Sequence, residues 1–214
     1  MIARDLTRGA GGAGRAWRAV MPRLALALLT AVALLAACQS YDILVTKDQE
    51  CQARWADVQA QLQRRADLVP NLVAVVRASA QHEERTLQQV TQARAAATSI
   101  TLSAEDLEDP AKMAAFAKAQ DELRGALSRL LVVQEQYPDL KANAAFHDLQ
   151  IQIEGTENRL LRAREQYNAA VADYNAELGH VRGKVINRVT GRPFQPRAYF
   201  TATPEATAAP KVSF

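Results

Sequence analysis

Cys38 is the first residue whose chemistry stands out, because it ends an uncharged apolar run. The run covers residues 24–37, consists mostly of Leu, Ala and Val, and follows Arg23 directly. Fourteen residues of helix reach about 21 Å, which is short of the roughly 30 Å hydrocarbon core of a bilayer. The pattern is therefore typical of the apolar core of a signal sequence rather than of a membrane span.

The end of this run, Leu35-Ala36-Ala37-Cys38, resembles the bacterial lipobox. Small residues at 36 and 37 let the peptidase close on the backbone, and the Cys38 thiol would take a diacylglyceryl group before cleavage. We expect residues 1–37 to be a lipoprotein signal peptide and Cys38 to be the lipidated residue. An uncleaved anchor and a chance cysteine in an ordinary signal are the alternatives. The long n-region leaves the start open between Met1 and Met21.

Lipidation at Cys38 would tether the protein to a membrane, facing the periplasm. Two or three acyl chains hold a protein stably, whereas one holds it only marginally. Gln39 stands where inner-membrane lipoproteins of enteric bacteria carry Asp, which favours the outer membrane over the inner one. Cys51 cannot pair with a lipidated Cys38, and we interpret it as a small apolar residue on a helix face rather than a redox site.

Other residues with catalytic chemistry do not form a recognisable motif. His82-Glu83 lacks the second histidine of a zinc protease, since position 86 is Thr. The sequence has no Gly-rich phosphate loop, nucleophile elbow or Cys-X-X-Cys pair. Glu154 and Glu157 share a helix face, which is more typical of a polar network than of paired catalytic acids. We therefore predict no enzymatic activity, no metal and no cofactor.

The charge distribution gives no support for nucleic-acid binding. The whole chain has a formal net charge of +3, but its first 37 residues hold five arginines and one aspartate. Their removal leaves 21 of the 26 basic and 22 of the 23 acidic residues, so the mature chain is nearly neutral. A nucleic-acid partner is therefore not expected.

Long helices are expected to position these residues. Apolar side chains repeat at helical spacing over 42–66, 67–98, 104–136 and 143–178. In the last segment they alternate in steps of four and three, which indicates the seam of a coiled-coil-like, left-handed bundle. The residues of this seam are Leu149, Ile153, Thr156, Leu160, Ala163, Tyr167, Ala170 and Tyr174.

Pro70 decides between two topologies. Proline removes a helical N–H and pushes Val69 away from helical geometry, so we expect one helix to end there and Asp67 to cap the next. This predicts an all-α fold, an antiparallel four-helix bundle of long helices. The alternative is a three-helix protein whose first helix is kinked at Pro70. Four helices would return the end of the bundle to the anchor, whereas three would leave it at the far end.

Several motifs resemble the LemA family in a single register. The most distinctive is QRRADLVPNLV at 63–73, and the resemblance covers about residues 41–178. It implies a bundle of long helices at a bacterial membrane, and no assigned enzymatic activity. The chain departs from the family where a lipobox replaces an N-terminal transmembrane helix, and where 179–190 lack an expected Phe-Pro and apolar pattern. The further matching segments are His82-Glu83, Tyr137 to Asn143, Glu154 to Arg159, Tyr167-Asn168, Tyr174-Asn175 and the terminal PKVSF.

Polar residues within these motifs are expected to form contacts between helices that fix their register, because charges near an apolar stripe need partners. Tyr167-Asn168 and Tyr174-Asn175 favour core packing over a ladder that binds a sugar or a peptide. The residues of the predicted polar network are Arg64, Arg65, Asp67, Glu83, Glu157, Asn158 and Arg159.

The C-terminal part is basic, with no acidic residue between 178 and 204. Two interpretations stay open: a helix end packed on the bundle, or an amphipathic segment on an anionic lipid surface. We divide the chain into a signal at 1–37, a helical bundle at 38–190 and an irregular, largely flexible tail at 191–214. The residues that would contact the membrane surface are Arg182, Lys184, Arg188 and Arg192.

These features favour a non-enzymatic, membrane-tethered helical scaffold of the bacterial cell envelope that binds protein partners. The alternative is an envelope lipoprotein that binds a small ligand or a peptide.

Overall fold

The computed structural model describes residues 10–79, 83–189 and 194–201, and all regular structure within them is helical. The all-α prediction is confirmed. Among these residues the long helices are α1 (Ala10–Ser79), α2 (Glu84–Ser99), α3 (Pro110–Val132) and α5 (Ala144–Gly179). The short elements are the 3₁₀ turns η1 (Asp106–Glu108) and η2 (Val133–Gln136) and the helices α4 (Pro138–Lys141) and α6 (Val181–Val189).

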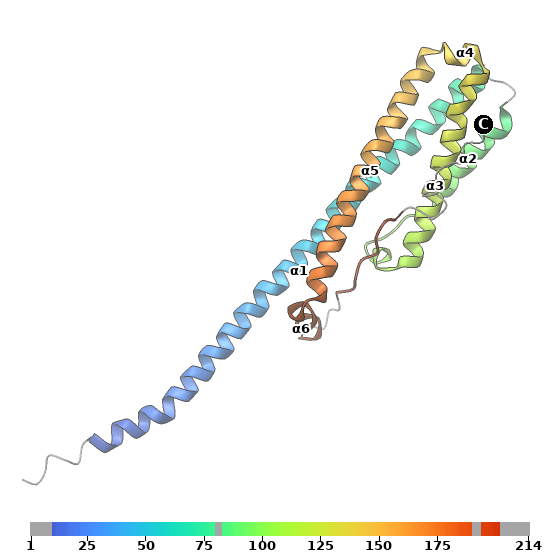
Figure 1. Ribbon diagram of the computed structural model, residues 1–214. Helices are drawn as coiled ribbons and strands as arrows, with labels where there is room; N and C mark the ends of the chain where they lie inside the picture. Colours follow the sequence, from blue (N-terminus) through green and yellow to red (C-terminus); the bar gives the residue numbers. More distant parts are fainter. Residues whose placement is uncertain (1–9, 80–82, 190–193, 202–214) are drawn as a thin grey trace, which may run out of the picture.

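The four long helices lie alongside one another and alternate in direction (Figure 1). Helix α2 folds back along the end of α1, and α5 runs antiparallel to α1, with Arg65 of α1 beside Glu157 of α5. Helix α1 continues far beyond the others toward its N-terminus (Figure 1). No helix within the described residues is both long enough and apolar enough to cross a membrane.

Helix α1 runs through Pro70 to Ser79, so the predicted end of a helix before this proline is wrong. Proline at 70 cannot donate to the carbonyl of Ala66, four residues earlier. The Nε of Arg94, on α2, donates to that carbonyl at 2.7 Å instead. Because a side chain from the next helix supplies the missing donor, the helix continues to Ser79, and the next helix, α2, begins at Glu84.

The third long helix begins later than predicted, at Pro110 rather than near residue 104. Ser103 and Asp106 form a reciprocal cap, which closes only the turn η1. The carboxylate of Asp109 accepts from the backbone N–H of Ala111 at 2.8 Å, and Pro110 occupies the first helical position. Both features favour a helix start.

The core consists of two clusters stacked along the bundle. The cluster near α4 is built from α1, α2, α3 and α5, and includes Leu72, Val90 and Leu130. Helix α2 does not reach the other cluster, which contains Trp55 and Tyr167. There the loop after α2 and residues 198 and 200 complete the core. The apolar stripes predicted for α1 and α5 are buried as expected.

Helix α6 lies at the end of the bundle from which α1 continues toward the N-terminus (Figure 1). A β-carbon at Gly183 would lie 2.7 Å from the carbonyl oxygen of Glu177, so the corner between α5 and α6 needs a residue without a side chain. The rings of Tyr41 and Phe194 meet with their centroids 5.8 Å apart. The C-terminal segment thus returns to the part of α1 that follows Cys38.

Candidate functional site

Three asparagines hold residues 194–200 by their main chain. Asn175 exchanges two hydrogen bonds with the backbone of Arg197: its Nδ2 donates to the carbonyl, and the Arg197 N–H donates to its Oδ1, each at 2.9 Å. Asn168 makes the same pair with Phe200 at 3.0 and 2.9 Å. Asn187 makes it with Phe194. An asparagine amide thereby replaces the neighbouring strand that an extended segment would have in a sheet.

Two tyrosines of α5 add hydrogen bonds to this row of asparagines, and we call the combined row of Asn and Tyr side chains the ladder. The hydroxyl of Tyr167 donates to the carbonyl of Ala198 at 3.0 Å, and that of Tyr174 donates to the carbonyl of Gln195 at 3.1 Å. Both side chains are almost completely buried. Burial raises the pKa of both phenols, so they stay protonated and keep donating throughout the neutral range.

Arg197 fastens the segment to helix α1. It is 4% exposed, and its guanidinium pairs with the carboxylate of Asp48, with the Nε of Arg197 2.8 Å from Oδ1. Its Nη1 also donates to the carbonyl of Ala104. The backbone N–H of Ala198 donates to the carbonyl of Leu107 at 2.7 Å. The segment is therefore attached on three sides, by α5, α1 and the loop before α3.

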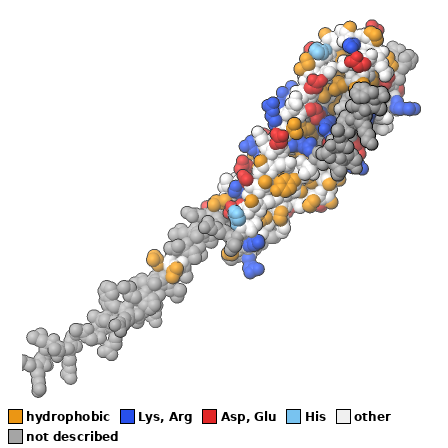
Figure 2. Space-filling view, in the orientation of Figure 1, with side chains coloured by type: hydrophobic (Ala, Val, Ile, Leu, Met, Phe, Trp, Pro, Cys, Tyr) orange, Lys and Arg blue, Asp and Glu red, His pale blue; other side chains and the backbone are white. Residues whose placement is uncertain are grey.

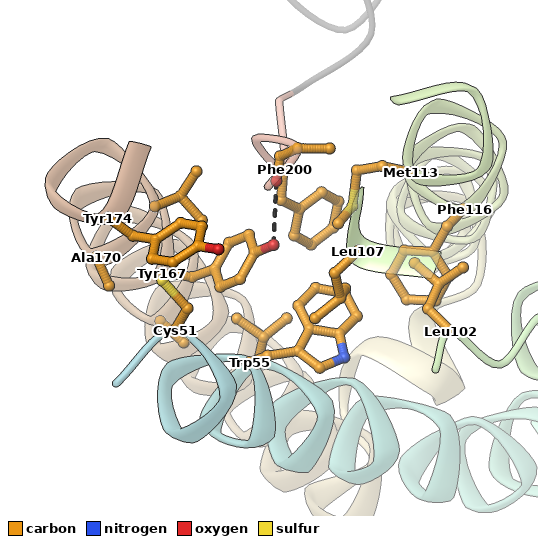
Figure 3. Packing of buried hydrophobic residues seen from close by; sticks show 14 of the residues in the cluster. Cys51, Trp55, Leu102, Leu107, Met113, Phe116, Tyr167, Ala170, Tyr174 and Phe200 are labelled. Carbon is orange, nitrogen blue, oxygen red and sulfur yellow. Dashed lines mark hydrogen bonds between the residues drawn. The ribbon is translucent and has the colours of Figure 1, made fainter. Parts of the chain in front are cut away.

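Phe200 fills the centre of the cluster that lacks α2 (Figure 3). Its ring centroid lies 6.0 Å from that of Trp55 and 5.7 Å from that of Phe116. Tyr167 and Trp55 are also paired, at 5.2 Å, and the guanidinium of Arg164 lies 4.4 Å from the Phe200 centroid. Aromatic pairs at these separations are favourable beyond the area they bury.

These contacts hold residues 194–200, which lie within the segment 191–214 that was predicted to be irregular and largely flexible. Residues 194–201 are irregular in backbone, as expected, but Arg197, Ala198 and Phe200 are buried and the main chain is held at each of the positions described above. The rest of the predicted tail, including TATPEATAAP after its first residue, lies outside the described residues. The tyrosine rings of the two Tyr-Asn pairs are buried in the core, and the same pairs also hydrogen-bond the main chain of residues 195–200.

Part of the predicted polar network meets between the two core clusters. Arg65 is 1% exposed, and its Nη1 donates to the carboxylate of Glu157 at 2.9 Å. Its Nη2 donates to the side chain of Gln120, whose own amide donates to the carbonyl of Ala97 at 3.0 Å. One arginine thus links α1, α3 and α5, and Gln120 carries the link to α2.

Glu83 is the other predicted residue with a partner on another element. Its carboxylate accepts from the hydroxyl of Tyr137 at 3.1 Å and from that of Thr86 at 3.0 Å. Burial, followed by this hydrogen bond, raises the pKa of Tyr137. Gln120 and Arg94 were not among the predicted network residues, since neither spacing nor residue type reveals which distant group each will meet.

The remaining predicted network residues lie at the surface. Arg64, Asn158 and Arg159 are exposed, and Arg159 reaches only Thr156 of its own helix, at 3.5 Å. Asp67 is exposed and accepts from Gln63 of the same helix at 2.7 Å. The structure therefore places the contacts between elements on Arg65, Glu83 and Glu157, and among the residues it describes no hydrogen bond joins the other four to another helix.

The residues predicted for attachment to a membrane are described only in part. Cys38 belongs to the backbone of α1, and its side chain lies outside the described residues, as do the side chains of Arg182 and Arg192. Lys184 and Arg188 are exposed on α6. Lys, Arg, Asp and Glu side chains are interspersed on the visible face of the bundle (Figure 2).

Cys51 is fully buried, in the same core cluster as Tyr167 and Tyr174. Burial raises the pKa of its thiol to about 11, which removes the thiolate that nucleophilic or redox chemistry would need.

Within the described residues, no three His, Cys, Asp or Glu side chains are placed to hold a metal ion together. His82 lies outside them. A cavity of about 190 Å³ between α1, α2 and α3 is lined by Leu62, Phe116 and Gln120 among others. It is smaller than typical small-molecule sites of roughly 300–1,000 Å³. Two further hollows, of about 310 Å³ beside Leu127 and Glu157 and about 460 Å³ beside Pro110 and Arg197, fall within that range. Among the described residues, the most extensive binding arrangement is the surface that holds residues 194–200. It is formed by α5, α6, α1 and the turn η1, and we call it the groove.

Comparison with known proteins gives the wider context for this arrangement. No curated protein was found to match the chain. The sequence profile described as "LemA family" matches residues 54–214, which includes the Pro70 motif, the Tyr-Asn pairs and the segment they hold. Because the match spans most of the chain, this protein belongs to the LemA family.

Proposed function

We propose that this protein is a lipid-anchored, non-enzymatic scaffold of the bacterial cell envelope whose helical body binds other proteins. The observation that carries the proposal is the short distance between anchor and core. Leu44 is fully buried only six residues after Cys38, which is about 9 Å of helix. A lipid on Cys38 would therefore hold the body of the protein close to the membrane, facing the periplasm, and Gln39 favours the outer membrane.

The position of the basic residues supports the same orientation. Lys184 and Arg188 are exposed on α6. This helix lies at the same end of the bundle as the contact between Tyr41 and Phe194. Each basic residue near an anionic lipid surface contributes about 1 kcal/mol of attraction. We propose that this end faces the membrane and that the end near α4 is free to meet partners in the periplasm.

Fatty-acid labelling tests the anchor. Cells would be given an alkynyl fatty acid, and the protein would be isolated and coupled to a fluorophore. We expect label on the wild-type chain and on Cys51→Ala, whose thiol is buried, but none on Cys38→Ala. Fractionation should find the labelled protein with the outer membrane. Label that persists on Cys38→Ala, or an unlabelled wild-type chain in the soluble fraction, would disprove the anchor.

Crosslinking in intact cells tests the scaffold role. A photoreactive residue would be placed at Val132, which is exposed at the end of α3, and a control at the exposed Lys184 of α6. We expect defined protein adducts at 132, and lipid adducts or none at 184. Absence of protein adducts at 132 and at further exposed positions of the same end would contradict partner binding.

The ladder of Tyr and Asn side chains favours the second candidate function, binding of a peptide. Through side chains of α5 and α6 it already holds the main chain of residues 194–200 at five positions. This function is compatible with a scaffold, since a peptide groove is one way of holding a partner.

A further inference from the structure

The spacing of the ladder matches a helix to an extended chain. Asn168 and Asn175 are seven residues apart on α5, which is about 10.5 Å along the helix axis. Their partners, Phe200 and Arg197, are three residues apart, and three residues of extended or polyproline II chain cover about 9–10 Å. The hydroxyls of Tyr167 and Tyr174 repeat the same match with Ala198 and Gln195. The segment runs antiparallel to α5.

This part of the recognition does not depend on the side chains of the segment. Each asparagine bonds both the N–H and the C=O of one residue, so any residue but proline could stand at 194, 197 or 200 as far as these bonds are concerned. Recognition of main chain by a fixed row of partners, with pockets for selected side chains, is how extended peptides are captured at sheet edges. Here a helix face supplies the row.

The side chains add a pattern. Phe194 packs on Tyr41, Arg197 pairs with Asp48, and Phe200 enters the aromatic cluster. The residues between them, among them Gln195, Pro196 and Tyr199, are exposed apart from Ala198. The groove therefore holds an aromatic residue, a basic residue and an aromatic residue at intervals of three.

We propose that this groove is a binding site for an extended segment of a partner protein with the pattern aromatic-x-x-Arg-x-x-aromatic, and that residues 194–200 are its occupant in cis. The proposal rests on the partner-binding function proposed above and adds to the end near α4 a second surface, beside α5 and α6. The segment has no regular structure of its own, and every contact described for it is one that a segment of another chain could make.

The cis segment is a strong competitor, because a short connection to α6 gives it an effective concentration in the millimolar range or above. The apparent affinity for a segment in trans falls in proportion to the fraction of molecules in which the groove is open. Weakening the cis segment should therefore strengthen binding in trans, whereas weakening the groove should abolish it.

The test uses a fluorescent peptide with the sequence of residues 193–202, PFQPRAYFTA, titrated against the full chain carrying Cys38→Ala. Anisotropy should show weak binding to the otherwise unchanged chain, and at least tenfold tighter binding to Phe200→Ala. The matched control is Tyr199→Ala, whose side chain is 45% exposed and which should bind like the parent. Adding Asn175→Ala to Phe200→Ala should weaken binding at least tenfold. A peptide with Ala at the positions of Arg197 and Phe200 should not bind.

Three results would overturn the proposal. The first is a cooperatively folded Phe200→Ala chain that does not bind the peptide. The second is equal binding to parent and Phe200→Ala, which would place the peptide elsewhere. The third is a dimer of the parent, seen by light scattering, that Phe200→Ala dissociates, since the groove would then serve a second copy. If Phe200→Ala does not fold, Arg197→Ala takes its place, because it leaves the ring in the core.

Failure of this test can be told from failure of the proposed function. The crosslinks at Val132 and its end of the bundle do not involve the groove, so they would persist if only the groove assignment were wrong.

Discussion

Arg94 supplies the hydrogen bond that Pro70 cannot make. The carbonyl of Ala66 would accept from residue 70 in an ordinary helix, and it accepts instead from the Nε of Arg94 at 2.7 Å. The two residues are on different helices, α1 and α2, so the bond both preserves α1 and holds α2 against it. A proline inside a helix and an arginine 24 residues later thus form one structural unit.

A double-mutant cycle should reveal this coupling. Arg94→Ala should lower the free energy of unfolding by about 1.5–3 kcal/mol, the usual range for a hydrogen bond to a charged group. In a Pro70→Ala background the loss should be clearly smaller, because an alanine at position 70 can itself donate to the carbonyl of Ala66. Urea denaturation of the four proteins measures the difference. Arg85→Ala, an exposed arginine of α2, is the control and should stay within about 0.5 kcal/mol of the parent. Equal losses in both backgrounds would contradict the coupling.

The buried arginine of the network should be far more sensitive than its neighbour. Arg65→Ala removes the partner of Glu157 and of Gln120, and breaking a buried pair in this way costs about 3–5 kcal/mol. Arg64→Ala and Arg159→Ala change exposed side chains and should stay within about 0.5 kcal/mol. Thermal unfolding followed by circular dichroism compares the three. A loss for Arg159→Ala as large as that for Arg65→Ala would contradict the arrangement.

The asparagine ladder should be visible in hydrogen exchange. The N–H of Arg197 is bonded to Asn175, and that of Phe200 to Asn168. Asn175→Ala should raise exchange at Arg197 by about 10- to 100-fold, equivalent to roughly 1.4–2.7 kcal/mol of local opening, and should affect Phe200 less. Asn158→Ala, an exposed asparagine of the same helix, should leave both amides unchanged. Unchanged exchange at Arg197 in Asn175→Ala would contradict the ladder.

Cys51 should make stability depend on alkaline pH. Burial raises the pKa of its thiol from 9.0 to about 11, so the unfolded chain ionises first and draws the equilibrium toward unfolding. The stability due to the neutral thiol is complete below pH 9 and is lost as the pH rises to about 11. Melting temperatures of the Cys38→Ala chain should therefore fall more between about pH 8.5 and 10.5 than those of the same chain with Cys51→Ala. Identical falls would show that the thiol does not contribute.

The sequence by itself determined the local features of this protein. Apolar residues at helical spacing identified the buried faces of α1 and α5, such as Leu44, Trp55, Leu160 and Tyr174, because the period of a helix is a property of neighbouring residues. The family motifs were also recognisable, since each lies within a short stretch of chain.

Only the tertiary structure decided how distant polar groups pair. From the sequence alone, Pro70 predicts the end of a helix, but in the structure Arg94 lies beside Ala66. Residues 194–200 are predicted to belong to a flexible tail, but in the structure Asn168 and Asn175 bind them. Arg64 and Arg65 are identical in type and adjacent in sequence, yet one is exposed and the other is buried against Glu157. A polar side chain or an unbonded carbonyl needs a hydrogen-bond partner when it is buried, but its residue type does not reveal which group that partner will be. That choice is made by the packing of the helices.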